Sequence, residues 1–150
     1  MSALLLMVQI GGRRCAIEAQ DVKSVIDLGV IAPVPRAPSF IAGITALRSQ
    51  ALTVIDCRLA MGLSDEVWPC DSRAAVVAVE GHSYALMVDA IEDITTGLSE
   101  PGQIPGGFGA QWSRAADGMI ETGIGPALLL NLPALIVGPE TSISRNVHAA

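Results

Sequence analysis

Residues 7–25 read MVQIGGRRCAIEAQDVKSV, and residues 76–94, VVAVEGHSYALMVDAIEDI, follow the same pattern. With Gly12 superposed on Gly81, apolar residues coincide at four later positions, the last being Val25 with Ile94. Each segment has an apolar run, a glycine-containing turn, a second apolar run and then two apolar residues three positions apart. Short runs of this kind are typical of strands joined by hairpins. The repeat therefore predicts two similar all-β halves.

The same apolar pattern recurs along the chain, and no stretch keeps a 3.6-residue period long enough for a major helix. The expected strands cover residues 4–10, 14–18, 22–28, 41–46, 51–55, 74–79, 83–88, 90–96, 118–122 and 127–130.

The ends of the two halves also correspond. Residues 53–56 (TVID) parallel residues 128–131 (LLLN), and a short helical pattern follows each. Asp56 and Asn131 are expected to be N-caps, because their side-chain oxygens can accept the free backbone N–H groups of the next turn. We therefore expect a short helix after each of these residues.

Two similar β halves indicate two small barrels packed together, since closing a sheet removes its exposed edges. We expect a single domain over residues 1–137, with the first barrel mainly from 10–63 and the second mainly from 73–137, their ends free to exchange. Residues 97–109 form a Gly/Pro-rich loop, and residues 138–150 are expected to be a disordered tail.

The composition points to a protein with partners and excludes several ligand classes. The chain has 150 residues, of which 51% are hydrophobic and only 16% are charged, with a net charge of −6. Low surface charge leaves apolar patches that commonly mark interfaces. The nine Lys and Arg residues are scattered. Binding of nucleic acid or attachment to anionic membranes is therefore not expected.

The sequence favours a location in the cytoplasm. No apolar stretch reaches the roughly 20 residues of a membrane helix, and residues 3–8 are interpreted as a strand and not as a signal peptide. The three cysteines are odd in number and irregularly spaced, which favours a reducing cytoplasm.

The sequence offers no enzyme site. His82 and His148 are the only histidines, one in a predicted turn and one in the tail, so neither is held beside Cys57 as a Cys–His pair requires. Three scattered cysteines do not make a zinc site, and no Lys-Ser/Thr follows the glycines of residues 106–109. We expect no catalytic residues, no metal and no cofactor, and a small hydrolase is only a distant alternative.

A second stretch allows a family to be suggested. Residues 31–58 read IAPVPRAPSFIAGITALRSQALTVIDCR, in which three prolines precede FIAGI, then LR, then VIDCR. This order resembles the signature of the CheW-like family of chemotaxis coupling proteins. Residues 86–94, LMVDAIEDI, resemble that family's Val-Asp-x-Val-x-x-Val segment. The resemblance covers about residues 4–137 and identifies the chain as a divergent member.

The resemblance implies two SH3-like barrels of five strands each and a non-enzymatic adaptor in bacterial chemotaxis signal transduction. It implies two partners, the signalling tip of a chemoreceptor (a methyl-accepting chemotaxis protein) and the regulatory domain of a CheA-type histidine kinase. The receptor tip would lie in an apolar groove between the barrels, while the kinase would bind barrel end to barrel end. The residues that would border the groove are Val22, Val25, Phe40, Ile41, Gly43, Ile91 and Ile94.

The sequence leaves the roles of several of these residues open. Val22, Val25, Ile91 and Ile94 are core residues or groove residues, and Phe40 and Ile41 pack in a turn or contact the partner. Leu47 and Arg48 are either structural or partner-binding.

This chain departs from the family pattern around Arg48 and at Ser24 in the expected strand 22–28. Ala46 and Ser49 replace the usual Asn and Gly, Thr53 replaces Pro, and Ser24 replaces a Glu that would pair with Arg48. An alternative is therefore a CheW-like module that has lost kinase coupling and acts as a structural or competing partner.

Overall fold

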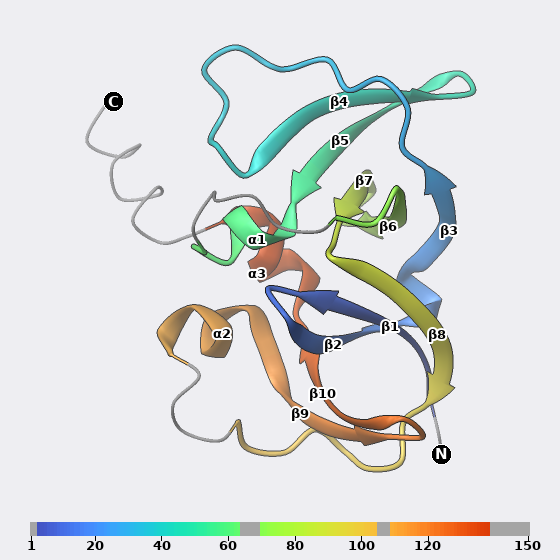
Figure 1. The fold of residues 1–150 in the computed structure, drawn as a ribbon, viewed down its shortest axis with the longest axis vertical. Helices are drawn as coiled ribbons and strands as arrows, with labels where there is room; N and C mark the ends of the chain where they lie inside the picture. Colours follow the sequence, from blue (N-terminus) through green and yellow to red (C-terminus); the bar gives the residue numbers. More distant parts are fainter. Residues whose placement is uncertain (1–2, 64–69, 105–108, 139–150) are drawn as a thin grey trace.

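The computed structural model describes residues 3–63, 70–104 and 109–138, and its elements are shown in Figure 1. Ten strands and four short helical segments lie in the described part of the chain. The strands are β1 Leu4–Ile10, β2 Arg13–Glu18, β3 Val22–Asp27, β4 Ile41–Leu47, β5 Gln50–Asp56, β6 Arg73–Val79, β7 His82–Met87, β8 Ala90–Thr96, β9 Ala116–Thr122 and β10 Gly125–Leu130. The helical segments are η1 Ala19–Asp21, α1 Cys57–Ala60, α2 Ala110–Ala115 and α3 Leu132–Val137.

The strands form two five-stranded sheets. One has the order β8-β1-β2-β10-β9 and lies in the lower half of Figure 1, and the other has the order β3-β6-β7-β5-β4 and lies in the upper half. An isolated bridge closes each sheet: Gly97, directly after β8, pairs with Thr122 of β9 below, and Ala32, in the loop after β3, pairs with Ile44 of β4 above. The sheets are therefore closed into a lower barrel and an upper barrel, and the all-β two-barrel prediction is confirmed.

The sheet order shows how strands are exchanged between the two halves. β3, β4 and β5 share one barrel and β8, β9 and β10 share the other, while β6 joins β3 and β1 joins β8 across the expected division. The upper barrel is thus continuous in sequence from β3 to β7, and the lower barrel combines β1 and β2 with β8, β9 and β10. The alternation of a strand indicates its buried face but not its neighbour, so the exchange had no local signal. The expected tail lies outside the described residues from 139 onward.

The core has three parts, which explains why several strands are apolar on both faces. One small cluster belongs to the lower barrel and one to the upper barrel, whereas the largest contains residues of both sheets. In β1, Leu5 and Met7 belong to the lower-barrel cluster, and Leu6 and Val8 belong to the large one. A strand buried on both faces has a continuous apolar run instead of an alternating one. We call the largest group, which fills the space between the barrels, the central cluster.

The helices cover one side of the central cluster. Asp56 Oδ1 accepts a hydrogen bond from Leu59 N at 3.2 Å and so caps α1, and Asn131 Oδ1 accepts one from Ala134 N at 3.0 Å and so caps α3. The sequence did not predict α2, which lacks a side-chain cap and forms around the buried Trp112. No helix in the described ranges has the length and apolar character needed to cross a membrane.

Candidate functional site

The register of β3 decides which of its side chains face the central cluster. Val22 lies opposite Val77 of β6, and Val25 lies opposite Ala75. Residues directly opposite in an antiparallel pair point to the same face of the sheet. Val77 and Ala75 both belong to the central cluster. Val22 and Val25 therefore point to the side of β3 on which the two barrels meet.

The equivalent strand β8 presents its own pair in the same way. Ile91 lies opposite Val8 of β1, and Ile94 lies opposite Leu6. Val8 and Leu6 are members of the central cluster as well. Leu4 lies on this face of β1 too, two residues before Leu6. The repeat seen in the sequence thus becomes two equivalent strands with apolar side chains directed to the barrel junction.

Burial divides these residues into an inner and an outer set. Val22 is half-buried against the central cluster, and Ile91 is only 7% exposed. Val25 is 40% exposed and Ile94 is 61% exposed, so the outer pair is available to a partner. Leu4, which the sequence interpretation missed, is 58% exposed. We call Leu4, Val22, Val25, Ile91 and Ile94 the junction strip.

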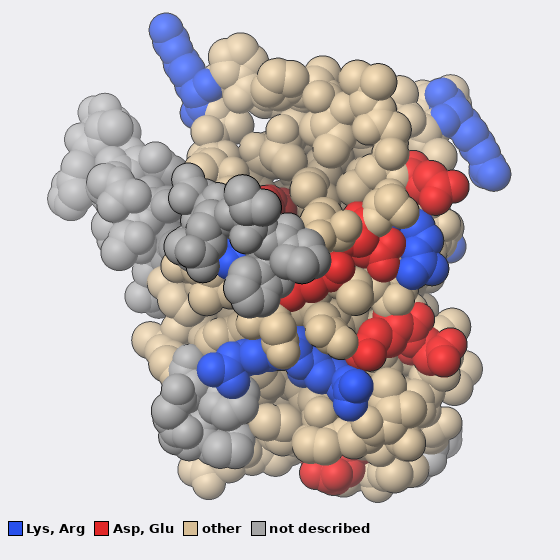
Figure 2. All heavy atoms as spheres, viewed as in Figure 1, with Lys and Arg blue, Asp and Glu red and all other residues tan. Residues whose placement is uncertain are grey.

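Charged side chains gather at one side of the junction. In Figure 2 most of the visible face is uncharged, and at the right, at the height where the two barrels meet, acidic side chains gather with basic ones beside them. Strand β8 carries Glu92 and Asp93, and β3 carries Lys23 and Asp27. The junction strip therefore lies in a mostly acidic setting.

Three other predicted groove residues offer little surface. Phe40 is 4% exposed in the central cluster, and Ile41 is half-buried against that cluster. Gly43 is buried, and a Cβ atom there would lie 2.3 Å from the carbonyl oxygen of Ala32. This chain's own loop therefore passes directly over Gly43, so Gly43 offers no open surface at the predicted groove.

Arg48 lies at the tip of the β4–β5 hairpin, at the top right of Figure 1, with a backbone φ of +57°. Its side chain is exposed, and within the described part of the chain no hydrogen bond or ion pair to it is found. Leu47, in contrast, packs against the interior cluster of the upper barrel. Leu47 is thus in a structural position, and Arg48 is available to a partner.

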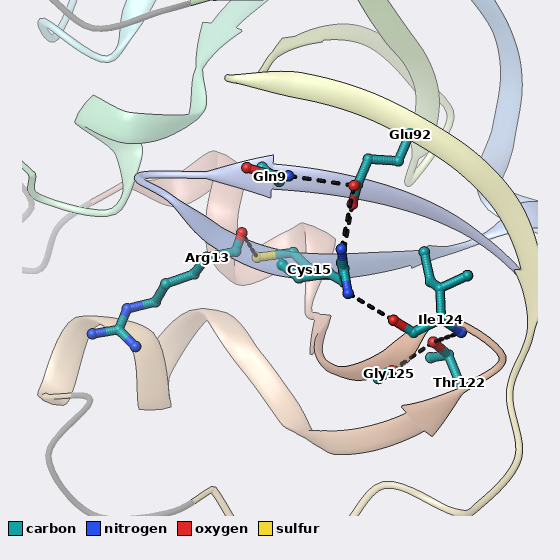
Figure 3. A network of polar contacts seen from close by, with 8 residues as sticks. Gln9, Arg13, Cys15, Glu92, Thr122, Ile124 and Gly125 are labelled. Atoms are coloured by element: carbon teal, nitrogen blue, oxygen red, sulfur yellow. Dashed lines mark hydrogen bonds and ion pairs between the residues drawn. The ribbon is translucent and has the colours of Figure 1, made fainter.

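A polar network closes one end of the lower barrel, as Figure 3 shows. Arg14 Nε lies 3.1 Å from Glu92 Oε1 of β8, and Arg14 Nη1 donates to the carbonyl oxygen of Ile124 at 2.7 Å. Gln9 Nε2 also donates to Glu92, at 3.3 Å. The network ties β8 across β1 to β2 and to the β9–β10 turn.

The other end of the lower barrel has a hollow. Its volume is about 460 Å³, and apolar residues of the barrel interior line it, among them Leu5, Ile120 and Leu129. Leu98 stands at this hollow and is 64% exposed, and Glu18 and Glu100 also line it. This barrel end thus combines an apolar recess with acidic side chains.

The two buried cysteines, Cys15 and Cys57, are not arranged for nucleophilic chemistry. Burial, and then the nearby Asp89 carboxylate, raises the pKa of the Cys15 thiol, and burial raises the pKa of Cys57. A buried thiol of raised pKa is a poor nucleophile because the thiolate is the reactive form. His82 is exposed at the start of β7. No group of three or more metal-ligating side chains is found among residues 3–63, 70–104 and 109–138.

Comparison with known proteins agrees with this geometry. The family described as CheW-like domain matches residues 4–140. Chemotaxis protein CheW of Treponema pallidum (strain Nichols) is 22% identical over 144 residues, which cover 91% of this chain and 83% of that protein. Chemotaxis protein CheW of Rhizobium meliloti (strain 1021) is 26% identical over 61% of this chain and 59% of that protein. Protein FrzA of Myxococcus xanthus is 38% identical over 48 residues, which are 32% of this chain and 30% of that protein.

The fold has a counterpart among solved structures. The crystal structure of scaffolding protein TtCheW from Thermoanaerobacter tengcongensis matches with a TM-score of 0.76 at 22% identity, covering 87% of this chain and 90% of that one. The two closed five-stranded sheets are thus the paired SH3-like barrels that the resemblance implied. Since the family match extends over residues 4–140, nearly the whole sequence, this chain belongs to the CheW-like domain family.

Proposed function

We propose that this protein is a non-enzymatic adaptor that couples chemoreceptors to a CheA-type histidine kinase in bacterial chemotaxis signalling. The observation that carries the proposal is the CheW-like family match over residues 4–140. Relatives of this chain are named chemotaxis proteins, and the similar solved structure is named a scaffolding protein. We place the protein in the cytoplasm, where both partners would meet it.

The junction strip is the proposed receptor site. A helix that docks in an apolar groove inserts a few side chains spaced at i, i+3, i+4 and i+7. Val25 and Ile94 are exposed apolar residues on equivalent strands, and Leu4 extends the surface on the side of β1. The acidic residues of β8 favour a tip that has basic residues beside its apolar anchors. The partner we propose is therefore the helical signalling tip of a chemoreceptor.

The hollow end of the lower barrel is the proposed kinase contact. Leu98 is exposed beside an apolar recess, which suits a partner barrel that inserts an apolar side chain. Leu5, Ile120 and Leu129 line this recess, whereas the exposed residues of the junction strip do not. Two partners could thus be bound at separate surfaces, as an adaptor requires.

Titration of a receptor signalling-tip fragment tests the receptor site. Val25→Asp and Ile94→Asp should each weaken binding by about tenfold or more, because an anchor is replaced by a charge that must be desolvated. Val30→Asp is the matched control, since Val30 is 89% exposed on the loop between β3 and β4. Equal loss in all three variants, or no loss in the first two, would contradict the proposed receptor site.

A second candidate function is an interaction module that no longer couples to a kinase. It is favoured by Ser24, which stands where a Glu would pair with Arg48, and by the exposed Arg48 side chain. Titration with the kinase regulatory domain separates the two functions. If the unaltered protein binds the kinase regulatory domain and Leu98→Asp abolishes this binding, the adaptor function is supported. If the unaltered protein does not bind that domain, the second candidate is supported.

A further inference from the structure

Two side chains of the upper barrel hold the edge of β8 in the lower barrel. Asp71 lies two residues before Arg73, the first residue of β6. Asp71 Oδ2 accepts a hydrogen bond from Ile91 N at 2.8 Å, and Arg73 Nη2 donates to the Ile91 carbonyl oxygen at 3.2 Å. Both backbone polar groups of Ile91 are therefore bound by side chains that come from the other barrel.

The position of β8 explains why these hydrogen bonds are needed. In the order β8-β1-β2-β10-β9, β8 is an outer strand, so its backbone groups that do not face β1 lack a neighbouring strand over most of its length. Ile91 is only 7% exposed, and buried backbone groups without partners are costly. Asp71 and Arg73 thus substitute for the missing strand at Ile91.

The pair itself is rigid. Arg73 Nε and Nη2 each lie 3.0 Å from a different carboxylate oxygen of Asp71, and Arg73 N donates to Asp71 Oδ1 at 2.9 Å. Two parallel hydrogen bonds between guanidinium and carboxylate impose one relative orientation. The Asp71 side chain is 12% exposed and the Arg73 side chain 45%, so water reaches the guanidinium but competes little for the carboxylate oxygens. The pair can therefore transmit the position of β6 to Ile91.

The same short segment also binds β3. Arg73 lies opposite Asp27 in the β3–β6 ladder, and Leu28 N donates to the carbonyl oxygen of Ser72 at 2.9 Å. Residues 71–73 consequently connect β3 to β8. These are the two strands that carry Val22, Val25, Ile91 and Ile94 of the junction strip.

We infer that Asp71 and Arg73 form a positioning pair that, by holding the backbone of Ile91, sets the placement of β8 relative to β3 and thereby the affinity of the junction strip for its partner. The pair acts through Ile91 and is not itself an anchor for the partner. The binding part of this inference rests on the proposed receptor function, whereas the placement of β8 does not.

The test compares Arg73→Gln and Asp71→Asn with Arg14→Gln. The Arg14 variant is the matched control, because Arg14 also forms an ion pair with β8 but through the Glu92 side chain and within the lower barrel (Figure 3). Amide hydrogen exchange at Ile91 should accelerate much more in the first two variants than in the control, because only they alter the side chains that bind the Ile91 backbone. Their affinity for a receptor signalling-tip fragment should fall by about tenfold, the effect of about one net hydrogen bond.

Arg73→Lys separates the positioning role from a role that depends only on charge or only on stability, through its receptor affinity and its melting temperature. Lysine keeps the charge but cannot form two parallel bonds to Asp71 and a third to Ile91. We expect only partial recovery of affinity, at a melting temperature close to that of the unaltered protein. Full recovery of receptor affinity in Arg73→Lys would overturn the inference, and so would an unchanged exchange rate at Ile91 in Arg73→Gln. Equal loss of receptor and kinase binding through unfolding would overturn it as well.

The two hypotheses fail in different ways. If the unaltered protein does not bind the receptor tip, the proposed function and the binding half of this inference are refuted together. In that case, the exchange rate at Ile91 still decides whether the pair holds β8. If the unaltered protein binds and the Arg73 variants bind equally well, only the positioning role is refuted.

Discussion

Replacement of Gly43 by alanine tests how the upper barrel is closed. Gly43 lies in β4 with a φ of +150°, and the loop after β3 passes directly over it. An added Cβ would lie 2.3 Å from the Ala32 carbonyl oxygen and 2.8 Å from Ile31 Cγ2. Neither distance is tolerable for a carbon atom, so the loop would have to move away from β4.

The loss of stability can be worked out from these contacts. Ala32 N donates to the Ile44 carbonyl oxygen at 2.9 Å, and Ile44 N donates back to Ala32 at 2.8 Å. Displacement of the loop breaks both bonds, at about 1 kcal/mol each. The positive φ adds about 1–3 kcal/mol for a residue with a side chain. We therefore expect Gly43→Ala to lower the free energy of unfolding by about 3–5 kcal/mol.

Urea denaturation measures this loss as a shift of the midpoint at constant slope. Gly81→Ala is the control, because Gly81 has a φ of +82° but a Cβ there would meet no atom within 4 Å. It should cost only about 1 kcal/mol of backbone strain. Gly118→Ala, the equivalent position in the lower barrel, should behave like Gly43→Ala, since its Cβ would lie 2.5 Å from Gly102 O. If Gly43→Ala costs no more than Gly81→Ala, the reasoning on barrel closure is refuted.

Three further predictions concern single side chains. Arg48→Glu should weaken partner binding and barely change the melting temperature, because exposed charges contribute about 0–1 kcal/mol; unfolding of this variant would show that Arg48 is structural. Asn131→Ala should lower the free energy of unfolding by about 1 kcal/mol through loss of the bond from Ala134 N. Asn131→Asp keeps the capping oxygen but places a second carboxylate where Asn131 Nδ2 donates to Asp117 Oδ1 at 2.9 Å, so it should restore the stability only in part. The hydrogen bonds from the Arg73 side chain lower the pKa of Asp71 from 3.8 to about 2. Because this folded-state pKa lies below the unfolded value, the stabilisation is present above about pH 4 and is lost as the pH falls toward 2; acid unfolding of Asp71→Asn should lack that part of the transition.

Local features of the sequence predicted the elements well. Apolar runs located all ten strands of the described residues, and Asp56 and Asn131 located the starts of α1 and α3. Two helical segments were missed, the single turn η1 and α2, and α2 has no side-chain cap and follows Gly109. The stabilisation of α2 comes mainly from the burial of Trp112, which depends on tertiary packing.

The candidate site was predicted less completely. The family resemblance pointed to Val25 and Ile94, and both are exposed at the barrel junction. It pointed equally to Phe40, which is buried in the central cluster, and it did not point to Leu4. All are apolar residues, and only the packing of distant strands separates exposed from buried ones.

The sequence by itself determined the strands, the two-fold repeat, the helix caps and the family, because each depends on residues that are neighbours along the chain. Tertiary structure alone decided the exchange of β1 and β2 for β6 and β7 between the two halves and the contact of Gly43 with Ala32. It also decided that Asp71 and Arg73 bind the backbone of Ile91. These contacts join segments that are distant in sequence, so their partners are specified by the closure and stacking of the sheets and leave no local pattern in the chain.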